Sequence, residues 1–437
     1  MALTDLNIQV KDMAVGYGHY LAIGTNGSLY SWGLNNHGQL GFGDKTNRTN
    51  PTKIGTATNW TKIACGDYHS LALNDQGEVY GWGINNVAQC KPSYDSPGFT
   101  GDDIVTPTRW TNPTSDIFFD FYNGPYLNIA ANGSCSLASI AEAKPRRKTS
   151  PTTPTMTTAG FSGNLLGTGT TENNIVFDGS GPFSYITSNA YYRFPVLGKM
   201  AFGKSGFAFQ SGATGIYYTG NKGQYSSFLG NSFDRGFHFQ DVTDRQPGGY
   251  DPNVDLPPRK LQRKKNDVIR DEVYPGRYSE PLEEDDNKYI DFDLGDEFLL
   301  AIDSNNRLWG MSWANDSGSS MASSIVAPMS PVGNFGWVLY QPIDGAGIRP
   351  NNVNSGLELI DESRLWLNVS CGARHAIISD VDGNIFSMGN NAYGQLGRDY
   401  TTTSNITTIN QLESPANTTG FKIHACGPQA SLIAKES

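Results

Sequence analysis

An internal repeat is the feature that most constrains what this chain can fold into. Residues 16–41 read GYGHYLAIGTNGSLYSWGLNNHGQLG, and 50 positions later residues 66–89 read GDYHSLALNDQGEVYGWGINNVAQ without a gap. A third good copy lies at residues 372–397. A period of about 50 residues indicates a supersecondary unit that buries its apolar faces only against copies of itself. A length of 437 residues would by itself suggest about three domains, but the repeat predicts a single one, 1–437.

Weaker copies fill the rest of the chain. They lie around Gly133, Gly203 and Gly295, and a last, partial copy lies around Cys426 and Gly427. The repeats therefore start near residues 13, 63, 119, 200, 290, 369 and 424, which predicts seven similar units.

Each good copy is predicted to contain a β-hairpin. Apolar and polar side chains alternate on both sides of Thr25-Asn26-Gly27, and equivalent turns occur at residues 74–77, 304–306 and 380–383. A period of two around a turn rich in Asn, Asp or Gly is typical of antiparallel strands. A unit of about 50 residues with four short strands, repeated radially, predicts a propeller blade, so the expected fold class is all-β.

The repeat resembles that of the RCC1 (regulator of chromosome condensation) family in the motif C-G-x-x-H-S-x-A-L, followed by G-x-V-Y-x-W-G-x-N and G-Q-L-G. The residues that carry it are Cys65, Gly66, His69, Ser70, Ala72, Leu73, Gly77, Val79, Tyr80, Trp82, Gly83 and Asn85, with Gly38, Gln39, Leu40 and Gly41. The resemblance is strong in the first, second and sixth copies. It implies a seven-bladed β-propeller whose chain ends share a blade. We therefore expect Asn7-Ile8-Gln9-Val10 to pair with the C-terminal strands and close the ring.

The resemblance also implies two kinds of activity. The best-known one in the family is guanine-nucleotide exchange on a small nuclear GTPase, through loops on one propeller face, while other members are plain interaction platforms. The repeats alone do not confer exchange, because they build the ring and not the loops. Similar repeats also appear in bacterial and bacteriophage proteins.

The five cysteines are predicted to be structural thiols. Cys65, Cys371 and Cys426 share one repeat position, just before a Gly, where a small apolar side chain suits a crowded inner strand. Cys90 and Cys135 have neither a C-x-x-C pattern nor a close His partner. We therefore expect no metal site formed by the cysteines.

Three of the histidines also follow the repeat. His19, His69 and His375 occupy one position, which predicts hydrogen-bonded scaffold residues and not ligands. The other three, His37, His238 and His424, are scattered. We find no nucleophile elbow, zinc-binding helix motif or pair of catalytic carboxylates, so we expect no catalytic residue, no cofactor and no enzymatic activity.

A phosphate-binding pattern occurs once. Residues 198–205 read GKMAFGKS and match G-x-x-x-x-G-K-[ST] letter for letter, but that chemistry needs a helix after the loop. The sequel, residues 206–212, reads GFAFQSG, which predicts a strand and a Gly turn. We therefore expect no nucleotide site. Asp380 and Asp382 are likewise expected to shape a turn and not a calcium loop.

The charge balance limits the partners. With 42 acidic and 32 basic residues the net charge is −10, and a strongly anionic protein repels phosphate backbones, so nucleic-acid binding is disfavoured. No apolar run approaches about 18 residues, and the start Met1-Ala2-Leu3-Thr4-Asp5 is unlike a secretory signal. We expect no membrane insertion and no export.

Long intervals between the middle repeats are predicted to be inserted loops, at 143–195, 241–287 and 317–357, and such loops commonly carry the binding function. Two of them contain basic runs, for which solvated loop charge is the alternative to a partner contact. The candidate partner-binding residues in them are Arg146, Arg147, Lys148, Tyr191, Tyr192, Arg259, Lys260, Arg263, Lys264, Lys265, Trp337 and Tyr340.

These observations favour a non-catalytic scaffold that docks other protein subunits. The composition, rich in Asn, Thr, Gly and Tyr, is typical of phage particles, so we expect a virion structural protein of the tail, baseplate, host-contact apparatus or capsid decoration. Its partners would be virion proteins, with a host surface protein or glycan as further partners. The alternatives are an exchange factor for a small GTPase, a carbohydrate-binding propeller, and a cytoplasmic location.

Overall fold

Strands make up the regular secondary structure in the part of the chain that the structure describes, and no helix occurs there. The computed structural model describes residues 8–86, 89–90, 101–110, 125–143, 161–169, 183–185, 196–203, 206–211, 215–220, 259–260, 289–296, 298–312, 340–343, 347–350, 358–397, 405–412 and 421–435.

Six four-stranded antiparallel sheets follow one another along the described residues. The first contains β1 (Val10–Val15), β2 (His19–Gly24), β3 (Leu29–Gly33) and β4 (Arg48–Lys53). The second contains β5 (Trp60–Cys65), β6 (His69–Asn74), β7 (Val79–Gly83) and β8 (Ile104–Arg109). The third contains β9 (Tyr126–Asn132), β10 (Cys135–Ala143), β11 (Phe161–Gly169) and β12 (Phe183–Tyr185).

The fourth sheet contains β13 (Val196–Gly203), β14 (Gly206–Ser211), β15 (Gly215–Gly220) and β16 (Arg259–Lys260). The fifth contains β17 (Tyr289–Leu294), β18 (Phe298–Asp303), β19 (Leu308–Ser312) and β22 (Glu358–Asp361). The sixth contains β23 (Trp366–Cys371), β24 (His375–Asp380), β25 (Ile385–Asn390) and β26 (Asn405–Gln411). Two hairpins are separate: β20 (Tyr340–Ile343) with β21 (Gly347–Pro350), and the C-terminal hairpin, β27 (Phe421–Cys426) with β28 (Ser431–Lys435).

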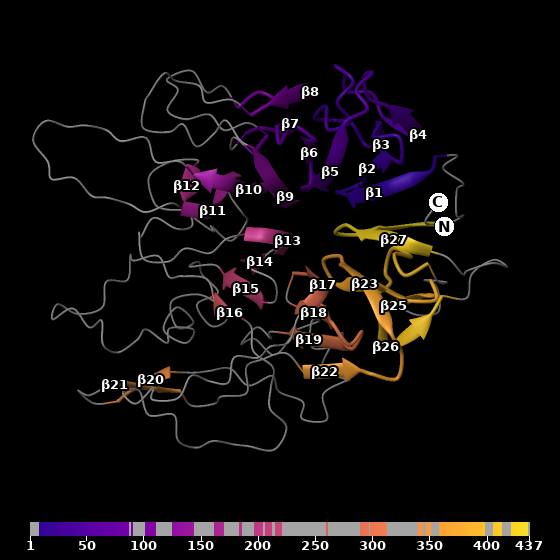
Figure 1. Cartoon of the computed structure of the whole chain (residues 1–437). Helices are drawn as coiled ribbons and strands as arrows, with labels where there is room; N and C mark the ends of the chain where they lie inside the picture. The colour runs from indigo at the N-terminus through magenta and orange to yellow at the C-terminus, as the bar shows by residue number, and fades with distance from the viewer. Residues whose placement is uncertain are drawn as a thin grey trace, which may run out of the picture.

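The sheets are arranged radially. Figure 1 shows the first strand of each sheet, and β27 of the C-terminal hairpin, around a common centre, with later strands further out. Each of these inner strands contacts the next one around the circle, and β27 contacts β1. The fold is therefore an all-β propeller, as the repeat predicts, and each four-stranded sheet is one blade.

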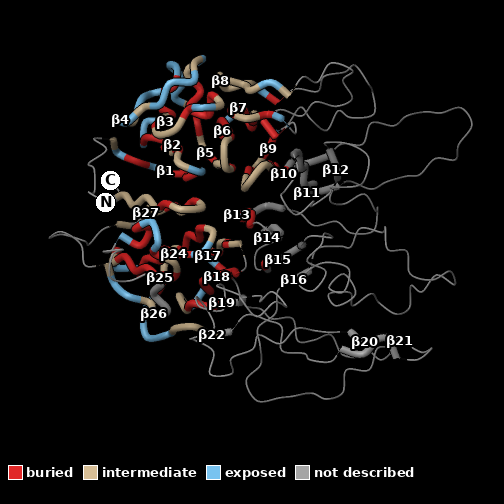
Figure 2. The backbone as a smooth tube through the Cα atoms, turned by 180° about the vertical axis from the view of Figure 1, so that it is seen from behind, coloured by how far each residue is buried: buried red, intermediate tan, exposed pale blue. Residues whose placement is uncertain are grey.

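Apolar side chains cover both faces of a blade. Leu21, Trp60 and Trp82 belong to one cluster between the first two blades, and Phe298 and Trp366 belong to another between the fifth and sixth. Because both faces are covered, every residue of the second strands β6, β18 and β24 is buried, as the red tube near the inner strands in Figure 2 illustrates. Removing this apolar surface from water stabilises the ring by about 25 cal/mol for each Å² buried.

The inner strands share one irregularity. The register against the second strand shifts near the start of β1, β5, β9, β17, β23 and β27. A β-bulge bends a strand and increases its local twist. The residues that directly follow the shift occupy one repeat position, and they are Asp12, Lys62, Asn128, Asp291, Asn368 and Ile423.

The turns between second and third strands are built as predicted. Asp380 Oδ1 accepts hydrogen bonds from the backbone N–H groups of Asp382 (3.1 Å) and Asn384 (2.8 Å). Gly383 takes a φ of 78°, and Asn306, in the equivalent turn of the fifth blade, takes a φ of 60°. The expectation that Asp380 and Asp382 shape a turn is confirmed.

The N-terminal prediction is wrong for the residues that the structure describes. Val10 pairs with Gly24 of β2, and the Gln9 carbonyl accepts a 2.8 Å hydrogen bond from the N–H of Thr25. The turn of the first blade needs a partner for this N–H group, and Gln9 supplies it. Residues 9 and 10 therefore extend the first blade and do not pair with the C-terminal strands, while residue 7 lies outside the described residues.

The first blade meets the C-terminal hairpin by side-chain packing. Ala425 of β27 lies in the same buried cluster as Val15 and Trp32, and Leu432 of β28 and Ile8 pack against that cluster. The contact between β27 and β1 is thus a face-to-face contact of the kind found between neighbouring blades.

Strands interrupt the three segments expected to be inserted loops. β11 and β12 lie within 143–195, β16 lies within 241–287, and β20 and β21 lie within 317–357. The prediction of loop throughout these segments is therefore wrong at these strands. A repeat search missed β11, the third strand of its blade, because it lacks the V-Y-x-W-G residues that β7 carries, and it missed the others because they match no part of the motif.

Candidate functional site

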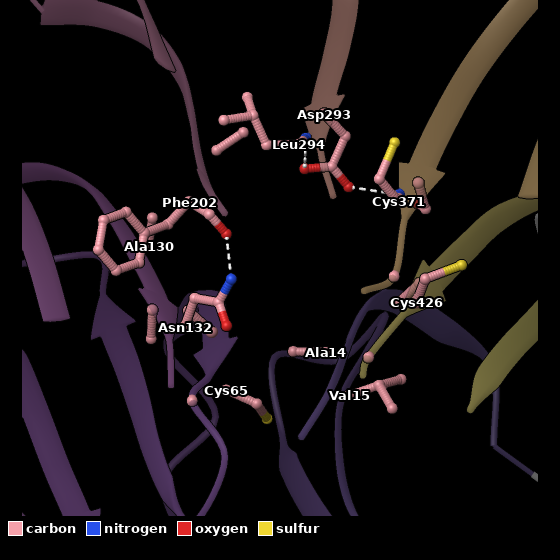
Figure 3. A pocket seen from close by; sticks show the side chains of 18 of the residues that line it. Ala14, Val15, Cys65, Ala130, Asn132, Phe202, Asp293, Leu294, Cys371 and Cys426 are labelled. Atoms are coloured by element: carbon pink, nitrogen blue, oxygen red, sulfur yellow. Dashed lines mark hydrogen bonds between the residues drawn. The ribbon is translucent and has the colours of Figure 1, made fainter. Parts of the chain in front are cut away.

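A cavity of about 270 Å³ lies at the centre of the propeller. The inner strand of every blade, the strand β27 and the turns that follow these strands surround it (Figure 3). Its lining falls into seven segments, at residues 12–15, 63–67, 129–132, 199–202, 293–296, 370–373 and 424–428. Because every repeat contributes to it, this cavity is the first candidate for a functional site.

One end of the cavity is narrowed by backbone that only glycine allows. A Cβ added to Gly66 would overlap the ring of His69 and lie 2.7 Å from the carbonyl oxygen of Gly133 in the next blade. The same Cβ on Gly16 would lie 2.6 Å from the Gly66 oxygen, and on Gly427 it would lie 3.0 Å from the Gly16 oxygen. These glycines therefore let successive inner strands approach one another, and Gly427 makes this contact with the first blade.

Polar side chains occupy one repeat position near the start of the inner strands, and two of them, Asp12 and Lys199, line the cavity. Six of the inner strands carry a charged or amide residue there, namely Asp12, Lys62, Asn128, Lys199, Asp291 and Asn368. These residues form bonds from one blade to the next. Lys62 donates to Asn128 Oδ1, and the Lys199 ammonium lies 2.7 Å from Asp291 Oδ1. We call this set the polar ring.

Lys199 is the basic residue of the polar ring that lines the cavity. Burial by itself would lower its pKa, but Asp291 and Asp293 outweigh that effect and raise the pKa of Lys199 above its usual range. The side chain keeps 40% of its surface accessible. The strands around the cavity limit the contact of Lys199 with bulk water, and the cavity itself leaves part of the side chain accessible. Lys199 is therefore a fixed cation at physiological pH.

The carboxylates of the inner strands hold the backbone of the next strand. Asp291 Oδ2 accepts the N–H of Val369 at 2.8 Å, and Asp293 Oδ2 accepts the N–H of Cys371 at 2.7 Å, which Figure 3 shows. Burial raises the pKa of Asp293, and it raises the pKa of Asp12 to about 6. These carboxylates therefore join neighbouring blades, so none of the three is an unpaired group available to a substrate.

Three thiols lie beside the cavity, on β5, β23 and β27 (Figure 3). Burial raises the pKa of Cys65 and of Cys371 far above the usual range and the pKa of Cys426 to about 12. The reactive form of cysteine is the thiolate, so these protonated thiols are poor nucleophiles. The five cysteines are all free, in agreement with the predicted structural role.

His424 is a cavity residue that the repeat pattern did not point to. Its Nδ1 lies 2.9 Å from Ser370 Oγ and its Nε2 lies 3.2 Å from Ser379 Oγ. Since Ser370 Oγ donates its proton to the His424 carbonyl, Nδ1–H is the donor to Ser370. Burial lowers the pKa of His424 to about 4, so the ring is neutral and both nitrogens are engaged.

The histidines of the repeat join neighbouring blades, which confirms their predicted scaffold role. His69 Nε2 lies 2.8 Å from Ser136 Oγ of the third blade, and Ser136 Oγ donates to the Gln89 carbonyl at 2.8 Å. His19 reaches Ser70 at 3.1 Å in the same way. Since each serine donates its own proton onwards, the histidine is the donor. Burial lowers the pKa of His19 to about 4 and that of His69 to about 3.

An aromatic cluster lies at the surface of the first two blades, next to the end of the cavity that Gly16 and Gly66 narrow. The ring centroids of Tyr17 and Tyr68 are 5.5 Å apart, and those of His37 and Tyr68 are also 5.5 Å apart. His37 Nδ1 lies 3.2 Å from Asp103 Oδ2, which also binds Lys45 at 2.6 Å. Tyr17 is 37% exposed, so this cluster can meet a partner. Sequence reasoning treated His37 as scattered, because Asp103 is far away along the chain.

Three of the residues predicted to bind partners lie among the described residues. Arg259 and Lys260 form β16, where they pair with Tyr218 and Tyr217 of β15, and Tyr340 begins β20. The others, namely Arg146, Arg147, Lys148, Tyr191, Tyr192, Arg263, Lys264, Lys265 and Trp337, lie outside the described residues. Their role in binding remains a prediction.

The rejected phosphate-binding pattern folds as predicted. Residues 198–203 belong to β13, and the strand β14 follows where a nucleotide-binding loop would need a helix. Lys199 of this pattern is paired with Asp291 across the blade junction. Within the described residues no group of three or more His, Cys, Asp and Glu side chains is placed to hold a metal ion. No helix in that part of the chain is long and apolar enough to cross a membrane.

Comparison with known proteins gives the repeat its name. The description "Regulator of chromosome condensation (RCC1) repeat" matches residues 26–73 and, in a second form, residues 10–39, 60–89 and 366–395. The chain carries RCC1 repeats. These matches fall on the first, second and sixth blades, where the motif of the sequence is strongest.

Two known proteins resemble this chain over short stretches. The ultraviolet-B receptor UVR8 of Arabidopsis thaliana is 40% identical over 62 residues, which cover 14% of this chain and 14% of UVR8. The E3 ubiquitin-protein ligase HERC2 of Homo sapiens is 39% identical over 60 residues, which cover 13% of this chain and 1% of HERC2. The matched segment thus spans well under a fifth of these relatives, so it identifies a shared repeat and not a shared activity.

Solved structures show the similarity of the whole fold. Human WBSCR16 superposes with a TM-score of 0.60 at 16% identity, covering 99% of this chain and 89% of that one. Prp20p of Saccharomyces cerevisiae superposes with a TM-score of 0.58 at 16% identity, covering 97% and 82%. The fold of this chain is therefore an RCC1-like propeller.

Proposed function

We propose that this protein is a non-catalytic docking scaffold built on a seven-bladed ring. The C-terminal hairpin would be the seventh unit. Seven segments line the central cavity, and Gly427 contacts Gly16 as Gly16 contacts Gly66, which supports this count. A ring closed on itself removes sheet edges around its centre and gives a rigid frame for the segments between the strands.

The observation that carries the docking proposal is the use of the charged groups at the centre. Lys199, Asp291 and Asp293 bind one another or the backbone of the next blade, and His424 is neutral with both nitrogens bonded. A catalytic site commonly holds a base or nucleophile whose pKa is tuned for proton transfer, and here burial leaves neutral thiols and imidazoles. The centre therefore works as a frame, and the function lies on the periphery.

We place the docking residues in the segments 143–195, 241–287 and 317–357, and the protein in a phage particle, in contact with other virion proteins or with a host surface protein or glycan. The support is the sequence: basic runs at 146–148 and 263–265, aromatic residues at 191–192, 337 and 340, and a composition rich in Asn, Thr and Gly. The alternative location is the cytoplasm.

The test compares two charge-removal variants with a matched control. In one, Arg146, Arg147 and Lys148 become Ala. In the other, Arg263, Lys264 and Lys265 become Ala. The control is Lys45→Ala, an exposed cation of the first blade. We expect either test variant to lower incorporation into purified particles at least about ten-fold, with circular dichroism unchanged, because charge pairs at an interface core contribute strongly.

Two results would contradict this proposal separately. Normal incorporation of both variants would refute the assigned docking segments. Absence of the wild-type protein from purified particles would refute the virion placement while leaving the scaffold proposal standing.

Guanine-nucleotide exchange is the second candidate, because the fold resembles Prp20p, whose structure was described together with its binding to Gsp1p and histones. The aromatic cluster of Tyr17, Tyr68 and His37 would be the contact surface on this proposal. Nucleotide release from small GTPases, measured with and without the protein, tests it. Acceleration that disappears in Tyr68→Ala would favour exchange, and no acceleration across a panel of GTPases would favour the scaffold.

A further inference from the structure

The C-terminal hairpin contains a second strand with no third strand beside it in the described residues. In the repeat, Ser431 and Leu432 of β28 match Ser70 and Leu71 of β6. Ser431 Oγ lies 2.8 Å from His375 Nε2 of the sixth blade, as Ser70 Oγ lies beside His19 of the first. β28 therefore sits where a second strand sits in a complete blade.

The exposure of β28 differs from that of its counterparts. Every residue of β6, β18 and β24 is buried, whereas Leu432, Ile433 and Ala434 of β28 are half-buried. The cause is the neighbour: β6 lies between β5 and β7, whereas β28 pairs with β27 alone among the described strands. A strand edge with free N–H and C=O groups and apolar residues on both faces is a template for another strand.

The sixth blade carries the surface that such a third strand would cover. A Cβ added to Gly41 of the first blade would lie 3.0 Å from Nε1 of Trp82, in the third strand of the next blade, and 3.2 Å from Pro107. At the equivalent Gly397, the described atoms within 4 Å all belong to Leu412 of the same blade. The two glycine positions thus differ because the third strand of the next blade lies beside Gly41, and no described third strand lies beside Gly397.

The complete blades show which sequence this place accepts. The third strands β11 (FSGNLLGTG) and β15 (GIYYTG) differ from the rest. The other four read LYSWG in β3, VYGWG in β7, LWGMS in β19 and IFSMG at the start of β25. Their shared pattern is an apolar residue, an aromatic residue, Gly or Ser, then Trp or Met, then a small residue. The Trp has a specific partner, because Trp82 Nε1 donates to the Gln39 carbonyl of the preceding blade at 2.8 Å, and Gln395 is the equivalent residue in the sixth blade.

We propose that β28 accepts an extended segment of a partner protein as an antiparallel third strand, and that this segment carries the pattern of an apolar residue, an aromatic residue, Gly or Ser, Trp or Met, and a small residue. The inference names the partner class for the docking scaffold and rests on that proposed function. It predicts recognition by backbone hydrogen bonds together with a Trp or Met that covers the sixth blade.

The residues before Ile8 do not fit this place. Their sequence, MALTDLN, has no aromatic residue and no Gly. The chain direction of these residues is also wrong for a third strand, because β28 runs from the end near Gly427 towards the end where β1 begins. A segment beside β28 that continued into β1 would therefore run parallel to β28, whereas the third strand of each blade is antiparallel to the second.

Peptide binding to the full chain tests the proposal. The probe is a labelled peptide with the sequence of residues 27–34, GSLYSWGL, taken from the third strand of the first blade. We expect saturable binding by fluorescence anisotropy, protection of the amides of residues 431–434 from hydrogen exchange, and at least about ten-fold weaker binding when the peptide Trp is replaced by Asp. Because only the peptide changes, this comparison does not depend on the folding of a variant.

A pair of protein variants locates the site. Leu432→Asp should weaken peptide binding at least about ten-fold, whereas Val381→Asp, which also charges a partly exposed apolar position, should leave it unchanged. Three results would overturn the proposal: no peptide binding, binding that appears only after residues 1–7 are removed, or a dimer of the chain that Leu432→Asp converts to monomer. The particle-incorporation assay is independent of these results, so the docking scaffold can stand if the strand site fails.

Discussion

Two junctions between blades solve the same packing problem with different chemistry. Between the second and third blades, His69 donates to Ser136. Between the fifth and sixth blades, Phe298 takes the place of the histidine, and Ala376, one residue after His375, takes the place of the serine. Phe298 and Ala376 lie in one buried apolar cluster. The ring in each case lies against a glycine of its own blade.

The difference shows that the two facing residues of these junctions occur as matched pairs, either His with Ser or Phe with Ala. Histidines stand in the first, second and sixth blades, and serines stand in the next unit each time, at Ser70, Ser136 and Ser431. A buried imidazole without its serine would lose a hydrogen bond, and a buried serine without its imidazole would lose a donor. The apolar pair Phe298 and Ala376 has neither requirement, and neither of its side chains titrates.

Acid should separate the two kinds of junction most strongly. Burial lowers the folded-state pKa of His19, His375 and His424 to about 4 and that of His69 to about 3. The unfolded chain binds these protons first, so stability is full above about pH 6.5 and is lost as the pH falls towards 4, by up to about 3 kcal/mol for each histidine.

Denaturant unfolding at about pH 7.5 and about pH 5 measures this loss. Asp12 acts in the opposite direction between about pH 4 and 6, because its folded pKa is raised to about 6. The variant His69→Phe/Ser136→Ala converts one polar junction to the apolar type and should flatten the pH dependence. Equal stability of the wild type at the two pH values would be incompatible with buried neutral histidines.

A glycine substitution should test what both junctions share. Gly66→Ala places a Cβ into the ring of His69 and against the Gly133 carbonyl, and we expect a cost of about 3 kcal/mol or more from urea unfolding. The control is Gly55→Ala, where an added Cβ meets nothing within 4 Å and only the φ of 61° opposes it, at about 1 kcal/mol. Equal losses for the two variants would show that the blades can move apart.

A double-mutant cycle should sharpen the polar junction itself. His69→Phe alone leaves Ser136 without its donor and should cost about 2 kcal/mol, while the double variant with Ser136→Ala should recover part of this loss. Thermal and urea unfolding of the four proteins gives the coupling energy. Strict additivity would mean that the two side chains act independently.

The smallest effect is expected at the rim of a junction. Lys45 of the first blade binds Asp103 of the second at 2.6 Å, but its side chain is 52% exposed. Lys45→Ala should change stability by no more than about 0.5 kcal/mol, as solvated ion pairs generally do. A larger loss would mean that the ion pair at the rim, and not the histidine, provides much of the stability of the junction.

The sequence predicted the parts of the fold that every copy repeats. Period-two alternation and Asn-Gly turns gave the hairpins, and the shared position of His69 and His375 indicated a scaffold role. The outer strands β11 and β12 escaped because they carry no motif residue. Gln9 was assigned to the wrong sheet because a turn N–H group in the first blade, at Thr25, competes for its carbonyl.

The polar ring could not be found by residue type. Asp12, Lys199 and Asp291 differ in charge from copy to copy, so each looks like an ordinary surface residue of a strand. Only the alignment of the copies, followed by contact between neighbouring blades, shows that they meet. Aligning the copies by the position of the repeat histidine, seven residues further along the chain, would have revealed this position.

The bulge near the start of six inner strands has one more consequence. An extra residue at the same place in these six copies fixes the register of the residues that follow, so one of these blades can be exchanged for another without shifting the alternation of inward and outward side chains. Chimaeric proteins joined just before this point should keep the same alternation of side chains on both sides of the joint. The blade is therefore a unit that can be duplicated and recombined.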